Sequence, residues 1–249
     1  MILLFDVGNT NIKVGIADLK KVKKIYRLKT VSNKTADEYF LLLNSLIANE
    51  EVKGVVISSV VPSLTSTLEE LATRYFNIQP LVFGQGIKTG LMIKADNPKE
   101  VGADLIADAI GSFEYGDKVL VVDLGTANKF IYVENKVFKG CVITPGVMHS
   151  LNSLVSSTAL LPKVEIKAPK KVLGNNTISC MQSGISYGNA CMIDGFIDRI
   201  KKEVNVEDLK VVATGGLAKS IIPLCNSEII VDEFLTLKGL LEVYLKNIE

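Results

Sequence analysis

The chain has 249 residues, of which 48% are hydrophobic, and its formal net charge is +1. This length fits one large domain or two medium ones, and the apolar content is ample for a packed core. A nearly neutral chain shows no general attraction to nucleic acid or membranes. The lysine-rich segments 20–24 and 163–171 are locally basic, and we interpret both as solvated loops or hairpin ends.

The cysteines and the single histidine argue against a zinc site, because no two cysteines form a C-x-x-C pair. Scattered cysteines in a chain of this size are typical of reduced thiols in a cytosolic protein. The N-terminal apolar run stops at Asp6, too early for a signal peptide or a membrane span. We therefore expect a soluble, cytoplasmic protein. The cysteines are Cys141, Cys180, Cys191 and Cys225. We interpret the single histidine, His149, as structural or interfacial rather than catalytic.

The first half opens with three predicted strands, at residues 1–6, 13–18 and 24–30. A helix follows, because Thr35 and Glu38 form a capping-box pattern ahead of an apolar stripe. Residues 54–61 are a nearly continuous apolar run, which is typical of a strand covered on both faces. We then expect a helix over 64–75, a strand over 80–83 and a helix that begins at Asn97-Pro98.

The second half repeats this plan. We expect strands over 118–123, 131–133 and 137–143, a mixed segment over 147–175, a helix over 178–202, a strand over 211–213 and a closing helix over 235–245. Each half thus begins with an antiparallel meander and continues with alternating helices and strands. This pattern predicts an α/β molecule of two ribonuclease-H-like domains with a central nucleotide cleft. We place the domains at 1–115 and 116–249, with no flexible linker between them.

One pattern occurs twice, each time at the end of a predicted apolar strand. The first copy is Asp6-x-Gly8-Asn9-Thr10, and the second is Asp123-x-Gly125-Thr126-Ala127. The Asp can hold a hydrated Mg²⁺, and the Gly lets backbone N–H groups approach phosphate oxygens closely. A single copy would be an ordinary hairpin turn. Two copies in equivalent places, with a third glycine element at Thr214-Gly215-Gly216, favour a nucleotide site, although the chain has no P-loop and no Rossmann fingerprint.

An ordered set of short motifs resembles the type III pantothenate kinases. The set is Asp6-x-Gly8-Asn9-Thr10, Gly102-Ala103-Asp104, Asp123-x-Gly125-Thr126-Ala127, Pro145-Gly146, Leu161-Pro162, Gly174-x-Asn176-Thr177, Ser183-Gly184, Thr214-Gly215-Gly216 and Asp232-x-x-Leu235-x-x-x-Gly239-Leu240. No single piece is specific, but the order is, and it covers nearly the whole chain. The resemblance implies the actin-like ATPase fold of acetate and sugar kinases, a homodimer, and ATP-dependent phosphorylation of pantothenate, the first step toward coenzyme A. It also implies Mg²⁺ and a monovalent cation, K⁺ or NH₄⁺.

The resemblance also assigns roles to individual residues. Asp104 becomes the general base that takes the proton of the substrate hydroxyl, and Asp123 is assigned to the monovalent cation or to the network of metal and phosphate. Asp6 would bind Mg²⁺ through water. The residues assigned to ATP and its phosphates are Asp6, Gly8, Asn9, Thr10, Lys13, Thr126, Gly215 and Gly216. The residues assigned to the substrate are Gly102, Ala103 and Thr177.

Several of these residues also have a purely structural interpretation. Asp6 can be a turn residue bonded to its own loop, Lys13 a solvated strand lysine, and Thr177 a helix N-cap. The pair Gly215-Gly216 can simply form a tight strand-to-helix turn. Asp108 lies one helical turn after Asp104, and we interpret it as a solvated carboxylate.

The sequence departs from the family at several site positions. Leu105 stands where the family usually has Arg, and Asn128-Lys129 stands where it usually has two threonines. The chain also has Lys139-Gly140 and then Cys141 where two glycines are usual. Losing a clamping Arg removes a charge-assisted hydrogen bond of roughly 1.5–3 kcal/mol. Lys129 is a candidate for replacement charge, and strand alternation places it opposite Asn128, so only one of the two can face the phosphates.

These departures leave two alternatives to a pantothenate kinase. The first is a non-catalytic relative that binds nucleotide or a pantothenate-like ligand and acts as a regulator. The second is a kinase of the same fold that phosphorylates another small hydroxyl compound. Binding without phosphate transfer favours the first alternative, and a panel of substrates assayed with ATP separates the second.

Overall fold

The computed structural model describes residues 1–47, 50–84 and 86–248. The chain divides into two compact units, of which the first comprises residues 1–113, 136–138 and 234–249, and the second residues 114–135 and 139–233. A division at residue 115 would assign the last helix, α7 (Leu235–Ile248), to the second half, whereas it packs in the first unit. The reason is apolar burial, because Leu237 and Leu240 of α7 share a core cluster with Ile2 and Leu4.

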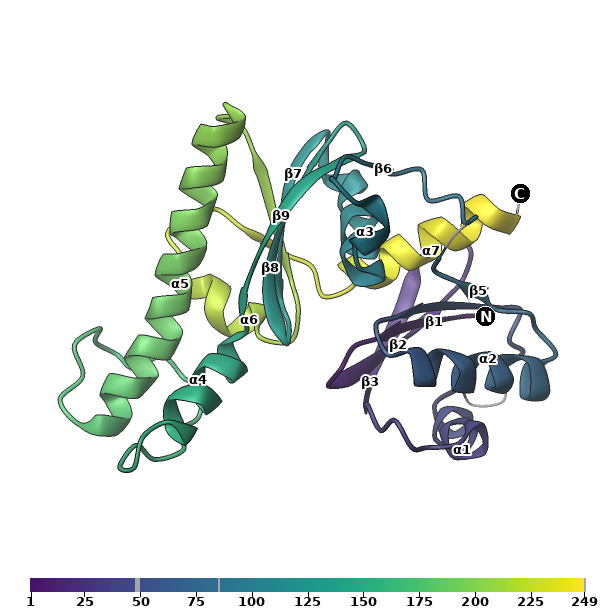
Figure 1. Ribbon diagram of the computed structural model, residues 1–249, viewed down its shortest axis with the longest axis horizontal. Coiled ribbons are helices and arrows are strands. Elements are labelled where there is room, and N and C mark those ends of the chain that lie inside the picture. Colours follow the sequence, from purple (N-terminus) through teal and green to yellow (C-terminus); the bar gives the residue numbers. More distant parts are fainter. Residues whose placement is uncertain (48–49, 85, 249) are drawn as a thin grey trace. The chain divides into compact units, whose positions relative to one another are not determined.

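The first unit is built on a five-stranded sheet of order β3-β2-β1-β4-β5 (Figure 1). Its strands are β1 (Ile2–Val7), β2 (Asn11–Ala17), β3 (Val22–Lys29), β4 (Gly54–Ser59) and β5 (Leu81–Val82). Its helices are α1 (Ala36–Ile47), α2 (Pro62–Phe76), α3 (Ala103–Gly111) and α7, with a 3₁₀ turn at Pro98–Glu100. β1 is antiparallel to β2 and parallel to β4, so the opening hairpin continues into a parallel sheet.

Both faces of this sheet are covered, as the apolar runs predict. Leu3 and Phe5 of β1 pack in the cluster that contains buried residues of α1 and α2, while Leu4 packs with α7. The capping box at the start of α1 is confirmed, because the Thr35 N–H donates to Glu38 Oε2 at 2.9 Å and the Glu38 N–H donates to Thr35 Oγ1 at 3.3 Å.

Helices α3 and α7 approach each other unusually closely. A Cβ atom on Gly239 would lie 1.9 Å from the Ala107 carbonyl oxygen, and one on Gly111 would lie 2.2 Å from that of Leu235. Only glycine fits at both positions, since a real Cβ never comes so near a backbone oxygen. This contact fixes the first turn of α7, with Thr236, beside α3.

The second unit repeats the plan of the first. Its strands are β7 (Lys118–Leu124), β8 (Ala127–Glu134), β10 (Lys210–Thr214), β11 (Ile230–Val231) and most of β9 (Val137–Pro145). The sheet order is β11-β10-β7-β8-β9-β6. The first two residues of β9 belong to the first unit and pair there with β6 (Met92–Ile93). β7 is antiparallel to β8 and parallel to β10, just as β1 is antiparallel to β2 and parallel to β4. The predicted internal repeat is therefore confirmed at the level of strand pairing.

The helices of the second unit are α4 (Val147–Ser156), α5 (Thr177–Val204) and α6 (Ala218–Ile221), with a 3₁₀ turn at Ile222–Leu224. A further 3₁₀ turn, Ser112–Tyr115, includes the last residues of the segment 1–113 and the first residues of the segment 114–135. Leu120 and Val122 of β7 form one core with Ile193 and Ile197 of α5. No helix in the described part of the chain has both the length and the apolar composition needed to cross a membrane.

Candidate active site

The first Asp-x-Gly motif lies in the hairpin that joins β1 to β2. The N–H of Gly8 donates to the Asn11 carbonyl at 3.0 Å and closes the turn. That N–H is therefore engaged within the loop. Asn9 and Thr10 lie exposed at the tip, so their polar groups are accessible to a ligand.

Asp6 and Lys13 are direct cross-strand partners in this hairpin. Lys13 Nζ lies 3.2 Å from Asp6 Oδ2, and the two side chains are only 17% and 12% exposed. Lys13 Nζ also donates to Thr236 Oγ1 at 3.2 Å. A lysine this deep requires an anion nearby, and in this structure the anion is Asp6. Lys13 is thus not the solvated strand lysine of the structural interpretation.

Asp108 is buried, so the interpretation of this residue as a solvated helix carboxylate is wrong. Only 1% of the residue is exposed, and the Thr236 hydroxyl donates to its Oδ1 at 2.6 Å. The first turn of α7 brings Thr236 to this carboxylate. Asp108, Thr236, Lys13 and Asp6 therefore form one continuous polar chain within the first unit.

Asp104 lies in the first turn of a helix that begins later than predicted. The Asn97 side chain does cap a turn, by accepting from the Lys99 N–H at 3.3 Å, but this is a 3₁₀ turn that ends at Glu100. Val101 then has extended backbone angles, and Gly102 is the N-cap of α3. The prediction of a single helix from Asn97 is therefore wrong, because the backbone leaves the helical conformation at Val101–Gly102.

This break places the Asp104 carboxylate at a helix N-terminus, where the helix dipole stabilises negative charge. Asp104 Oδ1 accepts the Leu105 N–H at 2.9 Å. A Cβ on Gly102 would lie 2.6 Å from the same oxygen, so the glycine leaves the space that the carboxylate occupies. Gly102 and Ala103, which are predicted to contact substrate, directly precede Asp104 in the sequence and are partly exposed.

The second Asp-x-Gly motif also lies in a hairpin, the one that joins β7 to β8, with a connection one residue shorter than in the first. Asp123 and Lys129 are direct cross-strand partners, and Lys129 Nζ lies 2.7 Å from Asp123 Oδ2. The Gly125 N–H donates to the Ala127 carbonyl at 3.3 Å, and Thr126 lies exposed at the tip. The Asp–Lys pair of the first hairpin therefore recurs in the second. Neither lysine belongs to the Asp-x-Gly motif itself, so the motif alone does not predict the pair.

Asn128 faces the opposite side of β8, as strand alternation predicts. Its Nδ2 donates to the Pro145 carbonyl at 3.2 Å and to Asn189 Oδ1 at 3.3 Å, and the residue is fully buried. Asn128 therefore ties β8 to the end of β9 and to α5. Of the two residues that replace the usual threonines, Lys129 is the one on the face of Asp123.

Gly215 and Gly216 form the turn between β10 and α6. Gly215 has a φ of +98°, and a Cβ there would lie 2.5 Å from the Leu124 carbonyl oxygen. The turn passes directly over the end of β7, so glycine is required for structural reasons alone. Gly216 is exposed, and a Cβ there would meet nothing among the described atoms within 4 Å.

Thr177 is the first residue of α5 and not its cap. The N-cap is Asn176, whose Oδ1 accepts the Ser179 N–H at 2.9 Å in a reciprocal capping box. The N-cap alternative for Thr177 is therefore wrong. Thr177 is exposed at the helix N-terminus, so its hydroxyl is accessible to a ligand.

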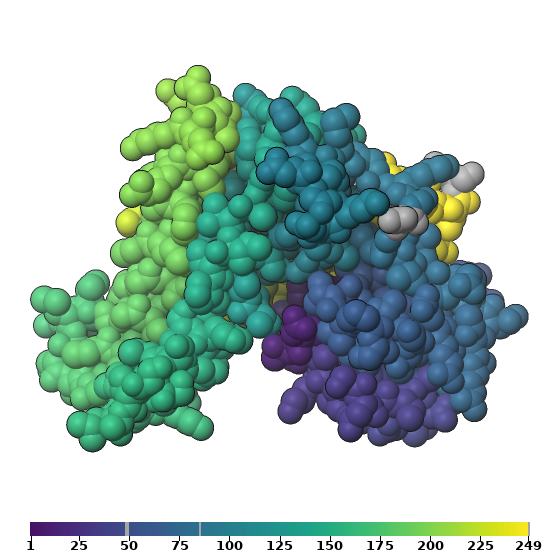
Figure 2. Space-filling view, in the orientation of Figure 1, coloured from purple at the N-terminus to yellow at the C-terminus, as the bar shows by residue number. Residues whose placement is uncertain are grey.

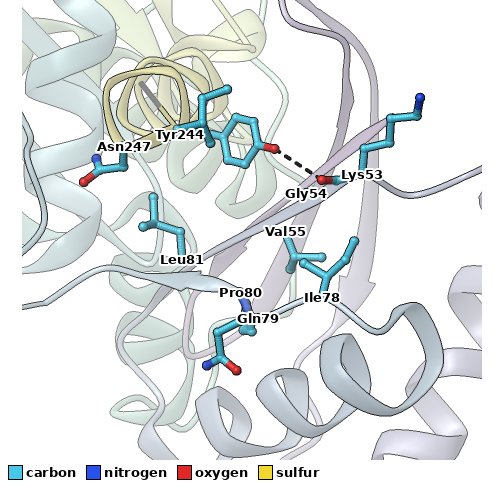
Figure 3. A pocket seen from close by; sticks show the side chains of 10 residues that line it. Lys53, Gly54, Val55, Ile78, Gln79, Pro80, Leu81, Tyr244 and Asn247 are labelled. Atoms are coloured by element: carbon cyan, nitrogen blue, oxygen red, sulfur yellow. Dashed lines mark hydrogen bonds between the residues drawn. The ribbon is translucent and has the colours of Figure 1, made fainter.

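A cavity of about 330 Å³ in the first unit is lined by Gly54, Leu81 and Tyr244, among others (Figure 3). Tyr244 Oη donates to the Lys53 carbonyl at its edge, at 3.3 Å. Gly54 pairs with Ile2, at the opposite end of β1 from Asp6. The cavity is therefore separate from the hairpin loop. The described residues also contain no cluster of three His, Cys, Asp or Glu side chains that would hold a metal unaided.

Comparisons with known proteins identify the family of this chain. Residues 2–199 match the family model of type III pantothenate kinase. The type III pantothenate kinase of Acholeplasma laidlawii is 48% identical over 249 residues, which cover all of both chains. The chain belongs to the type III pantothenate kinase family.

Solved structures support the fold of this family member. A protein of Campylobacter jejuni, described as a Baf family transcriptional activator, has a TM-score of 0.63 and 17% identity, over 98% of each chain. A polyphosphate/ATP-glucomannokinase of Arthrobacter has a TM-score of 0.51 and 16% identity, over 98% of this chain and 97% of that one. At such identities the likeness shows the fold alone. It agrees with the predicted α/β fold of two ribonuclease-H-like domains, as in actin-like sugar kinases.

Proposed function

We propose that this chain transfers the terminal phosphoryl group of ATP to the primary hydroxyl of pantothenate, giving 4'-phosphopantothenate, in the first step of coenzyme A biosynthesis. The match to the type III pantothenate kinases over the whole chain carries this proposal. Phosphoryl transfer needs mainly positioning and charge neutralisation, with little covalent chemistry by the protein. The residues of each unit supply groups of those kinds.

In the first unit, the exposed Asn9 and Thr10 contact phosphate oxygens, and Lys13 supplies a positive charge to them. Gly8 holds the loop closed through its hydrogen bond to Asn11. Asp6 fits a Mg²⁺ that arrives with ATP, because this ion is commonly held by one or two carboxylates together with phosphates and water. When bound, the ion neutralises charge on the phosphates.

Asp104 is the general base that accepts the hydroxyl proton of pantothenate. Its position in the first turn of α3 holds the carboxylate on a rigid element, and Gly102 gives it room. The family resemblance assigns Gly102, Ala103 and Thr177 to the substrate. A base in such a reaction contributes roughly 10²–10⁴-fold to the rate.

In the second unit, Thr126 contacts phosphate, and Gly215 and Gly216 lie against the adenosine. The family resemblance assigns a monovalent cation, K⁺ or NH₄⁺, to Asp123. The residues present do not fit that cation, because the Lys129 ammonium group already lies on the Asp123 carboxylate.

We also propose that the protein is a cytoplasmic homodimer. Large apolar side chains are exposed around α4 and the segment that follows it, and such concentrations mark protein interfaces. Figure 2 shows this part of the second unit, in the green range of the colour scale, at the surface. The side chains are Ile143, Met148, Leu154, Leu160, Leu173 and Ile178, which are 61%, 47%, 39%, 91%, 89% and 52% exposed.

A substrate panel tests the assignment of pantothenate. Purified protein is incubated with ATP and Mg²⁺ and with pantothenate, related amides or sugars, and the phosphorylated products are identified by mass spectrometry. We expect phosphorylation of pantothenate. Product from another compound in its place would indicate a kinase with a different substrate. Nucleotide binding without any product would indicate a non-catalytic relative in which Leu105 marks the loss of function.

A further inference from the structure

The Asp123 carboxylate forms a salt bridge with a lysine of the same chain. Lys129 Nζ lies 2.7 Å from Asp123 Oδ2, which is the length of a strong charge-assisted hydrogen bond. The lysine side chain is 15% exposed and that of Asp123 is 8% exposed. The pair is thus largely withdrawn from solvent, where salt screens it little.

The register of the sheet makes this contact a fixed one. Asp123 and Lys129 lie opposite each other in the antiparallel β7–β8 ladder, so their side chains leave the same face of the sheet. On the other face, Asn128 is anchored to Pro145 and Asn189. A slip of one residue in this register would bury Lys129 among the apolar residues of α5, so the ammonium group has a defined position.

An ammonium group resembles a monovalent cation in charge and in its preference for carboxylate oxygen. A second cation bound to the same carboxylate would be repelled by the lysine ammonium group, because the site is largely buried and solvent screens the repulsion only weakly. We propose that the Lys129 ammonium group takes the place of the monovalent cation at Asp123, so that the reaction of this chain requires neither K⁺ nor NH₄⁺. The contact at Asp123 is closer than its counterpart in the first hairpin, where Lys13 Nζ lies 3.2 Å from Asp6 Oδ2 and also donates to Thr236.

The first test compares salts, and its activity readout rests on the proposed function. ATP- and pantothenate-dependent ADP release is measured in chlorides of K⁺, NH₄⁺ and tetramethylammonium at equal ionic strength. The wild-type chain is expected to turn over at the same rate in all three salts. A rate that rises with K⁺ or NH₄⁺ at constant ionic strength would overturn the inference while leaving the kinase assignment intact.

The second test restores the residue that is usual in the family. Lys129→Thr is expected to lose about ten- to a hundredfold in turnover in tetramethylammonium, the cost of one charge-assisted hydrogen bond, and to recover it in K⁺ or NH₄⁺. Lys210→Thr is the matched control, because Lys210 lies at the far end of β10 and pairs with the exposed Asp208. A loss that no cation repairs would contradict the proposal.

A third readout does not depend on catalysis. The melting temperature of wild type is expected to be equal in K⁺ and tetramethylammonium, whereas Lys129→Thr should be stabilised specifically by K⁺ as the cation enters the vacated position. If no salt gives turnover with pantothenate, the proposed function fails, and the melting temperatures still decide the role of Lys129. Specific stabilisation of wild type by K⁺ would refute that role. The role of Lys129 would also be refuted if K⁺ raised the melting temperature of neither Lys129→Thr nor Lys129→Met. The same conclusion would follow if Lys129→Thr did not fold and K⁺ left the melting temperature of Lys129→Met unchanged.

Discussion

Lys13 and Thr236 come from opposite ends of the chain and meet through a hydrogen bond of 3.2 Å between Nζ and Oγ1. The Thr236 hydroxyl accepts this bond and donates its own proton to the buried carboxylate of Asp108 at 2.6 Å. The close packing of α7 on α3 through Gly239 and Gly111 fixes this arrangement. Thr236 is therefore a positioning residue that orients Lys13 in the first hairpin.

Replacing Thr236 by Val removes both hydrogen bonds while preserving side-chain shape. We expect the KM for ATP to rise about tenfold, because a hydrogen bond to a charged group contributes roughly 1.5–3 kcal/mol, with a smaller effect on kcat. Thr236→Ser should restore the wild-type value, and Thr73→Val is a control on an exposed helix. An unchanged KM in Thr236→Val would show that Lys13 needs no such support.

Replacing Asp104 by Asn tests the general base. We expect kcat to fall by roughly 10²–10⁴-fold, because the amide cannot accept the hydroxyl proton. Binding of ATP, measured by calorimetry, should stay nearly unchanged. Asp96→Asn, at an exposed position of the same unit, is the matched control. A fully active Asp104→Asn variant would contradict the assignment.

Asn128 is expected to contribute to stability more than to chemistry. Asn128→Ala removes the bonds to Pro145 and Asn189 from a fully buried position. Leaving those partners unsatisfied should destabilise the protein by about 1–3 kcal/mol, measured by urea unfolding. Asn175→Ala, at an exposed position, should change stability little. Equal midpoints for the two variants would show that the Asn128 amide is not structural.

The Asp194 carboxylate makes the second unit sensitive to acid. Partial burial raises the pKa of Asp194, but the N–H groups of Asn226 and Ser227, which donate at 2.8 and 3.0 Å, outweigh it and leave the pKa lowered. A lowered folded-state pKa gives stability that is present above the unfolded pKa of about 4 and lost as the pH falls further. The difference in unfolding midpoint between wild type and Asp194→Asn should therefore shrink below that pH, and a constant difference would contradict this origin.

Much of the fold followed from the sequence because its signals are local. The apolar run to Asp6 and its copy at Asp123 indicated two hairpins, and Thr35 with Glu38 indicated the start of α1; the strand pairings and the capping hydrogen bonds confirm these predictions. The break at Val101–Gly102 was missed, since Asn97 caps a short 3₁₀ turn as readily as a helix.

The polar chain of the first unit was missed because it depends on a contact across most of the sequence. Thr236 lies in an apolar stretch at the start of α7, and nothing local shows that it reaches Asp108 and Lys13. For Asp108 there was a signal, since Ala107, Ala109 and Ile110 surround it with apolar residues. A carboxylate in such a run favours a buried, hydrogen-bonded position over a solvated one.

The kinase assignment is tested most directly by a coupled assay of ADP release with purified protein, ATP and Mg²⁺, with and without pantothenate. We predict release that depends on pantothenate, saturates with it and is nearly abolished in Asp104→Asn. Protein that binds ATP in a separate measurement but releases no more ADP when pantothenate is added would contradict the account.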